Sequence, residues 1–116
     1  GSAVAVLTGN VPFSLATQSA GSIIRPASFC GVWGFKPSYG LVPRTGILKT
    51  CDTLDTVGFF TSHQKNLRVI LDNIRLEGKN YPYIYNNIDS KYIIMFVTTT
   101  ASSQWIFFLV CYNVAP

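Results

Sequence analysis

A serine among very small side chains is the first candidate for chemistry in this sequence. Ser22 follows Ala20-Gly21 in the segment 16–22, whose side chains are small or polar, and an apolar stretch begins at Ile23. Small side chains let a substrate approach the backbone, and a helix that begins here would point backbone N–H groups outward. Such donors stabilise the oxyanion of acyl transfer. On residue types alone, however, a Gly-Ser pair at a helix start is more often a simple cap.

The elements that would position Ser22 alternate between helix and strand. The clearest is a helix with one apolar face, because Leu67, Ile70, Leu71 and Ile74 recur at helical spacing. We expect helices over residues 1–8 and 23–30 and from a Thr61-Ser62 cap to before Gly78, a loop over 80–87, and strands over 11–15, 32–35, 57–60, 92–97 and 105–111. This alternation predicts an α/β layer architecture.

Composition narrows the classes of partner and compartment. The net charge is +4, but the nine cations are scattered and form no basic stripe, which argues against nucleic-acid binding. The longest apolar run, residues 105–111, is too short to cross a bilayer, so no membrane contact is expected. Three widely spaced cysteines and no visible signal peptide favour a reducing compartment, which we take to be the cytoplasm. One histidine and no CxxC pair give zinc no ligand motif.

A longer motif strengthens the hypothesis that Ser22 takes part in chemistry. Residues 17–46 read TQSAGSIIRPASFCGVWGFKPSYGLVPRTG. They resemble the signature of the amidase-signature family, approximately G-T-[D/Q]-x-G-G-S-I-[R/I]-x-P-A-x-x-C-G-x-x-G-[F/L]-K-P-[S/T]-x-G. Residues 1–6 are similar to the family's helix after its Gly-Gly-Ser-Ser loop, and residues 50–58 also fit. The resemblance is strong to about residue 76 and thins after it, so we expect a partial amidase-signature domain over 1–97 and a divergent tail over 98–116.

The resemblance implies a fold and a reaction. The fold would be a partial slice of a mixed β-sheet flanked by helices. Family members hydrolyse a carboxylic amide through a Ser-cisSer-Lys triad and a seryl acyl-enzyme, with no metal and no organic cofactor. Ser22 matches the nucleophile, and the substrate would be a small-molecule amide. The matching backbone donors of the oxyanion hole are those of Ser19, Ala20, Gly21 and Ser22. The matching supporting residues are Thr17, Arg25 and Asp55.

The chain departs from the family pattern in two respects. By the family's spacing, the cis-serine and the lysine lie upstream of Gly1, so this chain reads as an internal fragment that needs the remainder of the amidase domain as its partner. Lys36 belongs to the G-F-K-P element and is expected to anchor a turn rather than to act as the base. Ala20 replaces a glycine, which would strain the loop if that position required a positive φ.

Several alternatives stay open at this level. The chain could be a non-catalytic amidase remnant, or a piece of a glutamine-dependent amidotransferase subunit, since the family includes such subunits. Cys30 could instead be a nucleophile with His63 as its base, although Cys30 lies in an apolar context typical of a buried thiol. In each case we expect the isolated chain to lack amidase turnover, and its uncovered sheet edges and apolar faces to make it poorly soluble.

Overall fold

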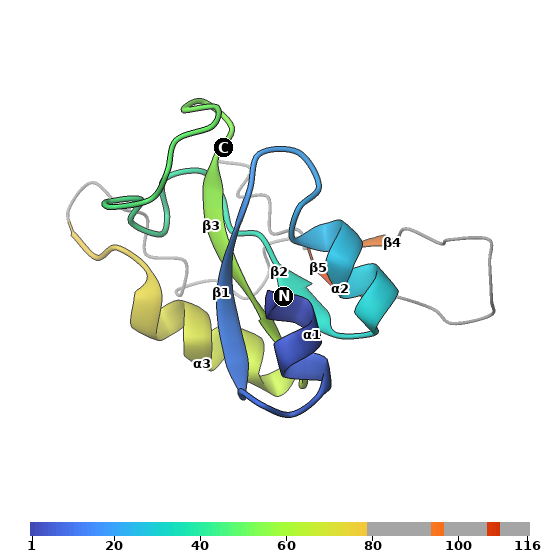
Figure 1. Ribbon diagram of the computed structural model, residues 1–116. Coiled ribbons are helices and arrows are strands. Elements are labelled where there is room, and N and C mark those ends of the chain that lie inside the picture. Colours follow the sequence, from blue (N-terminus) through green and yellow to red (C-terminus); the bar gives the residue numbers. More distant parts are fainter. Residues whose placement is uncertain (79–93, 97–106, 110–116) are drawn as a thin grey trace.

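The computed structural model describes residues 1–78, 94–96 and 107–109 (Figure 1). Its helices are α1 (Ser2–Leu7), α2 (Ile24–Cys30) and α3 (Lys65–Ile74). Its strands are β1 (Phe13–Gln18), β2 (Trp33–Phe35), β3 (Thr56–Thr61), β4 (Ile94–Phe96) and β5 (Phe107–Leu109). The two last strands lie within the ranges where strands were expected, whereas the expected loop over 80–87 lies outside the described residues.

The strands form one mixed sheet in the order β1-β3-β2-β5-β4. Neighbouring strands are antiparallel except β2 and β5, which pair in parallel at Phe35 and Leu109. The α/β class and the mixed sheet flanked by helices, both expected from the sequence, are therefore confirmed.

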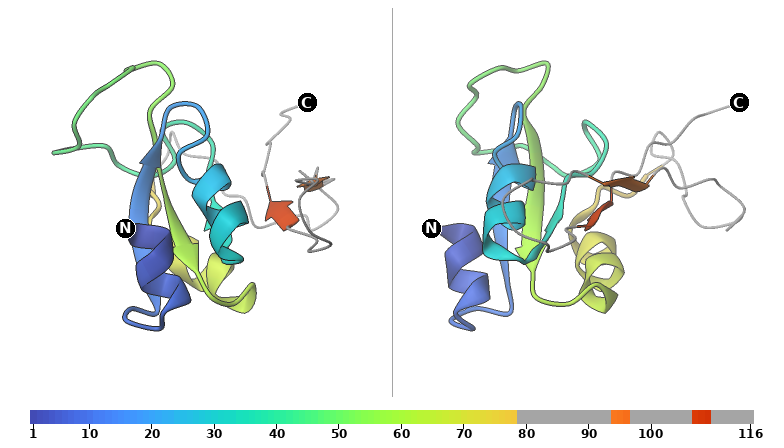
Figure 2. Two further views of the ribbon diagram at one scale, coloured as in Figure 1. Left: turned by 45° about the vertical axis from the view of Figure 1, so that its right-hand side comes forward. Right: turned by 90° about the vertical axis from the view of Figure 1, so that its right-hand side faces the viewer.

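Helices cover both faces of the sheet around β3 (Figure 2). Every residue of β3 is buried. Because side chains alternate along a strand, Val57 and Phe59 face α3, whereas Phe60 faces α1 and α2. β3 is thus the centre of two small hydrophobic clusters, one on each face.

The predicted apolar face of α3 is confirmed. Leu67 and Leu71 are buried, and Ile70 and Ile74 pack partly against the same cluster. The predicted N-terminal cap is wrong, because Thr61 still belongs to β3 and the N-cap position is Gln64, whose side chain makes no capping hydrogen bond. Pairing with β1 and β2 extends β3 by one residue at each end beyond the strand expected over 57–60.

β1 is longer than its apolar residues predicted. The expected strand ended at Leu15, but pairing with β3 continues to Gln18, opposite Thr56. The small side chains of Ala16 and Thr17 do not interrupt the strand, because six consecutive residues of β3 face β1 in register. The strand therefore delivers the chain directly to the segment that holds Ser22.

Two glycines let α2 pack closely on the sheet. A Cβ at Gly58 of β3 would lie 2.1 Å from the carbonyl oxygen of Phe35 and 2.7 Å from Cδ1 of Ile23. A Cβ at Gly34 of β2 would lie 2.6 Å from Cβ of Ala27. The missing side chains make room for Ile23, which is fully buried immediately before α2.

Candidate functional site

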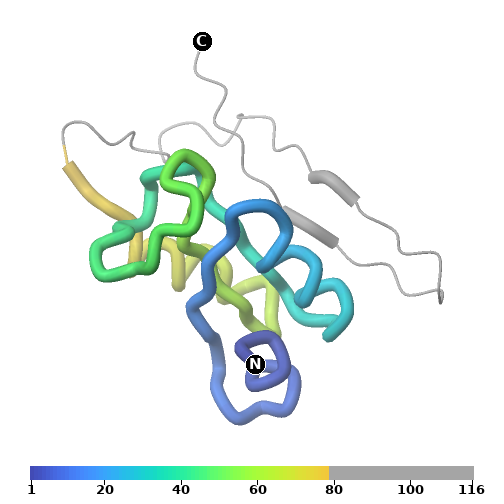
Figure 3. Tube along the Cα trace, turned by 45° about the horizontal axis from the view of Figure 1, so that its top comes forward, coloured from blue at the N-terminus to red at the C-terminus, as the bar shows by residue number. Residues whose placement is uncertain are grey.

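Ser22 lies in a short loop between β1 and α2. The loop is residues 19–22, called the Ser22 loop below, at the end of the sheet where β1 finishes (Figure 3). The Ser22 side chain is exposed, and no other described residue hydrogen-bonds its hydroxyl. Its neighbour Ile23 has no exposed surface. The exposed hydroxyl of Ser22 is thus next in sequence to Ile23, whose side chain is buried in the core.

Gln18 holds the C-terminal end of this loop. Its side-chain oxygen Oε1 accepts the backbone N–H of Ile23 at 2.8 Å and that of Ile24 at 3.0 Å. Sequence reasoning placed a side-chain cap at Ser22 instead, but Ser22 makes no such bond and α2 begins two residues later. The signal that could have identified Gln18 is the Asp-or-Gln position of the family signature.

Asp55 holds the N-terminal end of the loop. The Ser19 hydroxyl donates a hydrogen bond to Oδ1 of Asp55, across 36 residues of sequence. Oδ2 of Asp55 accepts the backbone N–H groups of Thr50 at 2.7 Å and Cys51 at 2.8 Å. These hydrogen bonds, led by the one from Ser19, hold the pKa of Asp55 below its ordinary value despite its burial. The ionised carboxylate therefore joins the Ser22 loop to the loop that precedes β3.

A second set of contacts braces the loop before β3. The Arg44 guanidinium donates to the backbone carbonyls of Asp52 at 2.8 Å and Asp55 at 3.2 Å. It also forms an ion pair with the Asp52 carboxylate at 3.0 Å and lies over the ring of Tyr39. The Tyr39 hydroxyl donates to the Asp52 carbonyl at 2.7 Å. Arg44 thus orders the chain on which Asp55 sits.

The backbone of the Ser22 loop answers the question raised by Ala20. Among the described residues, only glycines have a positive φ, so alanine occupies position 20 without left-handed strain. Within the same part of the chain, the N–H groups of Ser19, Ala20, Gly21 and Ser22 donate no hydrogen bond. The loop therefore has four consecutive backbone donors without an acceptor among the described residues, which is the type of group that an oxyanion requires.

The two other predicted supporting residues lie beside the loop without a polar contact to it. Arg25 is exposed, and its aliphatic stem lies over Gly21, where a Cβ would come within 2.8 Å of the Arg25 Cδ. Thr17 is exposed on β1 opposite Val57, and its side chain makes no hydrogen bond within residues 1–78. The supporting roles of both residues stay predictions.

Comparison with known proteins identifies the family. The sequence model described as amidase matches residues 1–85 of the 116. The chain belongs to the amidase family.

The amidase relatives are several times longer than this chain. It is 44% identical over 80 residues to a glutamyl-tRNA(Gln) amidotransferase subunit of Staphylococcus carnosus, a match that covers 69% of this chain and 16% of the relative. It is 45% identical over 74 residues to the protein of the same name from Mycoplasma pneumoniae, covering 64% and 16%. The crystal structure of an amidase family protein from Bacillus anthracis superposes with a TM-score of 0.63 at 33% identity, covering 67% of this chain and 15% of that protein.

Among the described residues, no hydrogen bond joins Lys36, Cys30 or His63 to Ser22. Lys36 donates to the carbonyl of Pro37 at 3.4 Å, the kind of turn contact expected of it, and partial burial lowers its pKa. Cys30 ends α2 and packs against the core, whereas His63 is exposed before α3, and no hydrogen bond joins them. In the described part of the chain, no three His, Cys, Asp or Glu residues group as metal ligands. No helix there is long and apolar enough to cross a membrane.

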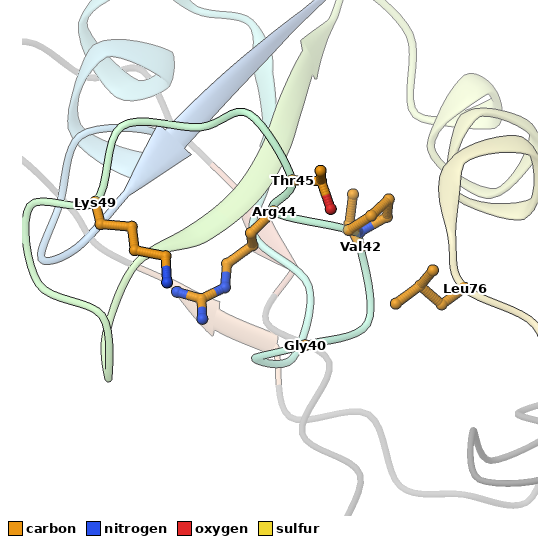
Figure 4. Close-up of a pocket in the computed structure, with 7 residues that line it drawn as sticks. Gly40, Val42, Arg44, Thr45, Lys49 and Leu76 are labelled. Carbon is orange, nitrogen blue, oxygen red and sulfur yellow. The ribbon is translucent and has the colours of Figure 1, made fainter.

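A surface pocket of about 380 Å³ lies beside the Arg44 side chain (Figure 4). Arg44 and Lys49 line one part of it, and Val42 and Leu76 another. No residue of the Ser22 loop lines it. Both cations pair with the single Asp52 carboxylate, which balances only one of their two positive charges.

Proposed function

We propose that this segment carries the nucleophile of an amidase that hydrolyses the carbon–nitrogen bond of a small-molecule carboxylic amide. The observation that carries the proposal is the Ser22 loop, which has an exposed hydroxyl and four backbone N–H groups that donate to no other described residue. Both ends of the loop are held, by Gln18 and by Asp55. Preorganised donors of this kind stabilise developing negative charge without further reorganisation.

The reaction follows from these groups. The Ser22 oxygen attacks the amide carbonyl carbon, and its proton passes to a base. The carbonyl oxygen becomes an oxyanion that the N–H groups of Ser19, Ala20, Gly21 and Ser22 are proposed to stabilise. The C–N bond then breaks, the nitrogen leaves with a proton, and Ser22 holds the acyl group as an ester. Water hydrolyses this ester and restores the hydroxyl.

The base and the relay serine are assigned to the remainder of the amidase domain. The chain spans 16% of the length of the Staphylococcus carnosus relative, which leaves room for both groups elsewhere. The surface of β1 fits such a partner. β1 is an edge strand, and its residues Phe13 and Leu15 are 42% and 53% exposed. An open edge with apolar side chains is a surface that another strand or layer covers in a whole domain.

A chimeric enzyme tests the proposal. Residues 1–78 replace the matching segment of the Bacillus anthracis amidase family protein, giving what we call the grafted amidase. We expect it to hydrolyse a simple arylamide and to form an acyl-enzyme on Ser22 that mass spectrometry detects. Ser22→Ala should abolish both, and Ser62→Ala, at an exposed serine before α3, should change neither. A folded but inactive grafted amidase would instead favour a non-catalytic remnant.

The names of the curated relatives favour a second candidate within the same chemistry. Both relatives described above are named as amidotransferase subunits. In that role Ser22 would attack the side-chain amide of glutamine and release ammonia to another protein of the complex. Glutaminase activity that appears only when a partner protein is added would support this candidate, whereas partner-independent arylamide hydrolysis would support a free-standing amidase.

The isolated chain should not turn over an amide. A serine that lacks its base loses several orders of magnitude in rate, even with an oxyanion hole in place. The experiment is an arylamide assay of the purified 116-residue chain, with Ser22→Ala as its control. Hydrolysis by the chain that the substitution abolishes would contradict this expectation.

We assign the protein to the cytoplasm, in keeping with the free thiols of Cys30 and Cys51.

A further inference from the structure

Gln18 stands at a junction between the sheet, the Ser22 loop and α2. It is the last residue of β1, and only 3% of its surface is exposed. The Ser22 loop follows the backbone of Gln18 directly. After its four residues, the backbone N–H of Ile23 donates to the side chain of the same glutamine. One buried residue therefore fixes where the loop starts and where it ends.

The contact acts one residue from the proposed nucleophile. The N–H of Ile23 donates to Oε1 of Gln18 at 2.8 Å, and Ile23 follows Ser22 directly. Ile23 is fully buried, so its N–H has no alternative partner in water if the oxygen is removed. An unpaired buried N–H is costly, and the backbone would shift to find a new acceptor. That shift would move the Ser22 hydroxyl.

We propose that Gln18 is a positioning residue for Ser22, acting only as a hydrogen-bond acceptor for the backbone of Ile23 and Ile24. This inference rests on the proposed function of Ser22. Both contacts use the same oxygen, and within the described residues the side-chain Nε2 donates to no group. A carboxylate of the same shape can accept both bonds, whereas an apolar side chain cannot.

The test compares three substitutions in the grafted amidase. Gln18→Leu keeps the size and removes the acceptor, Gln18→Glu keeps the acceptor, and Gln64→Leu repeats the first change at an exposed glutamine whose side chain makes no capping hydrogen bond. For Gln18→Leu we expect kcat for arylamide hydrolysis to fall about 100-fold with KM little changed, because a small displacement of a reacting group costs about that much. Gln18→Glu should recover most of kcat, and Gln64→Leu should match the parent.

A second measurement does not depend on activity. In the grafted amidase, hydrogen exchange followed by mass spectrometry should show the amides of Ile23 and Ile24 exchanging about tenfold faster in Gln18→Leu than in Gln64→Leu. Equal exchange in the two variants would overturn the inference. So would a Gln18→Leu enzyme at full kcat, or a Gln18→Glu enzyme as slow as Gln18→Leu.

The inference and the proposed function fail in different ways. If Ser22→Ala leaves the grafted amidase fully active, the proposed function is wrong and the exchange measurement alone decides whether Gln18 holds the backbone. If Ser22→Ala is inactive while Gln18→Leu keeps its kcat, only the positioning role is overturned.

Discussion

At the scale of single residues, the carboxylate of Asp55 shows how charge state controls the loop. An ionised carboxylate only accepts hydrogen bonds, and Asp55 receives three, from the Ser19 hydroxyl and the N–H groups of Thr50 and Cys51. Protonation weakens all three, and this is why the pKa of Asp55 is lowered in the folded protein. The stability that Asp55 contributes is present above its unfolded-state pKa of about 3.9 and is lost as the pH falls through the lower folded value.

Asp55→Asn should therefore lower the free energy of unfolding of the grafted amidase at pH 7. The loss should shrink as the pH falls below about 4, because the parent carboxyl is then protonated as well. Urea denaturation at several pH values measures both effects. Asp72→Asn, which alters partly exposed ion pairs on α3, serves as the control and should change the stability little. A loss for Asp55→Asn that is the same at pH 7 and pH 3 would contradict this explanation.

Ala20→Gly restores the residue of the family signature and should bring no benefit. Because φ at position 20 is not positive, glycine adds only unfolded-state freedom and should lower the free energy of unfolding by about 0.4–1 kcal/mol. The arylamide kcat of the grafted amidase should stay within a factor of about two, since the loop donors are already in place. A clear rise in kcat would show that alanine distorts the loop.

At the scale of elements, the sequence predicted what depends on neighbouring residues and missed what depends on distant pairing. The helical spacing of Leu67 and Leu71 was enough to place the buried face of α3. The full extent of β1 depends on pairing with β3, whose residues lie far along the chain. The small side chains before Gln18 gave no local sign that the strand continues to that residue. The motif predicts Ser22 as the nucleophile, and that role stays a prediction. The hydrogen bond from Ile23 to Gln18 was not predicted, although the family signature marks the position of Gln18.

Gly58→Ala tests the packing of α2 on the sheet. The new Cβ would lie 2.1 Å from the Phe35 carbonyl oxygen and 2.7 Å from the Ile23 side chain, so β2 or the residue beside Ser22 must move. We expect a loss of about 1–3 kcal/mol in unfolding free energy, together with a lower kcat. Urea denaturation and the arylamide assay of the grafted amidase measure both. Gly1→Ala, where a Cβ meets nothing within 4 Å, should change neither.

At the scale of the whole molecule, the open edge of the sheet governs solubility and assembly. Phe13 and Leu15 of β1 lie on the same face of the sheet as Phe59 of β3, and α3 packs on Phe59 but leaves these two side chains exposed. Exposed apolar edges promote association with other strands. The isolated chain should therefore aggregate, whereas a whole domain would bury the same surface.

Phe13→Lys combined with Leu15→Lys should act in opposite directions in the two contexts. In the isolated chain the two lysines should raise the soluble, monomeric fraction in analytical ultracentrifugation, because charge protects an edge strand. In the grafted amidase they should lower Tm by several degrees, because the same positions would be buried there. Val69→Lys, at an exposed apolar position on α3, is the control. Equal effects on Tm from the control and the double substitution would remove the special role of β1.

The bond between Ser19 and Asp55 also has a consequence for the order of events during synthesis. Its two partners are separated by 36 residues, and β3, on which β1 depends for pairing, follows Asp55 directly. When Ser22 has just emerged from the ribosome, the chain therefore lacks both Asp55 and β3, which order the loop. Non-local contacts of this kind form late. The Ser22 loop can therefore take its final conformation only after the chain has emerged as far as Thr61, where β3 ends.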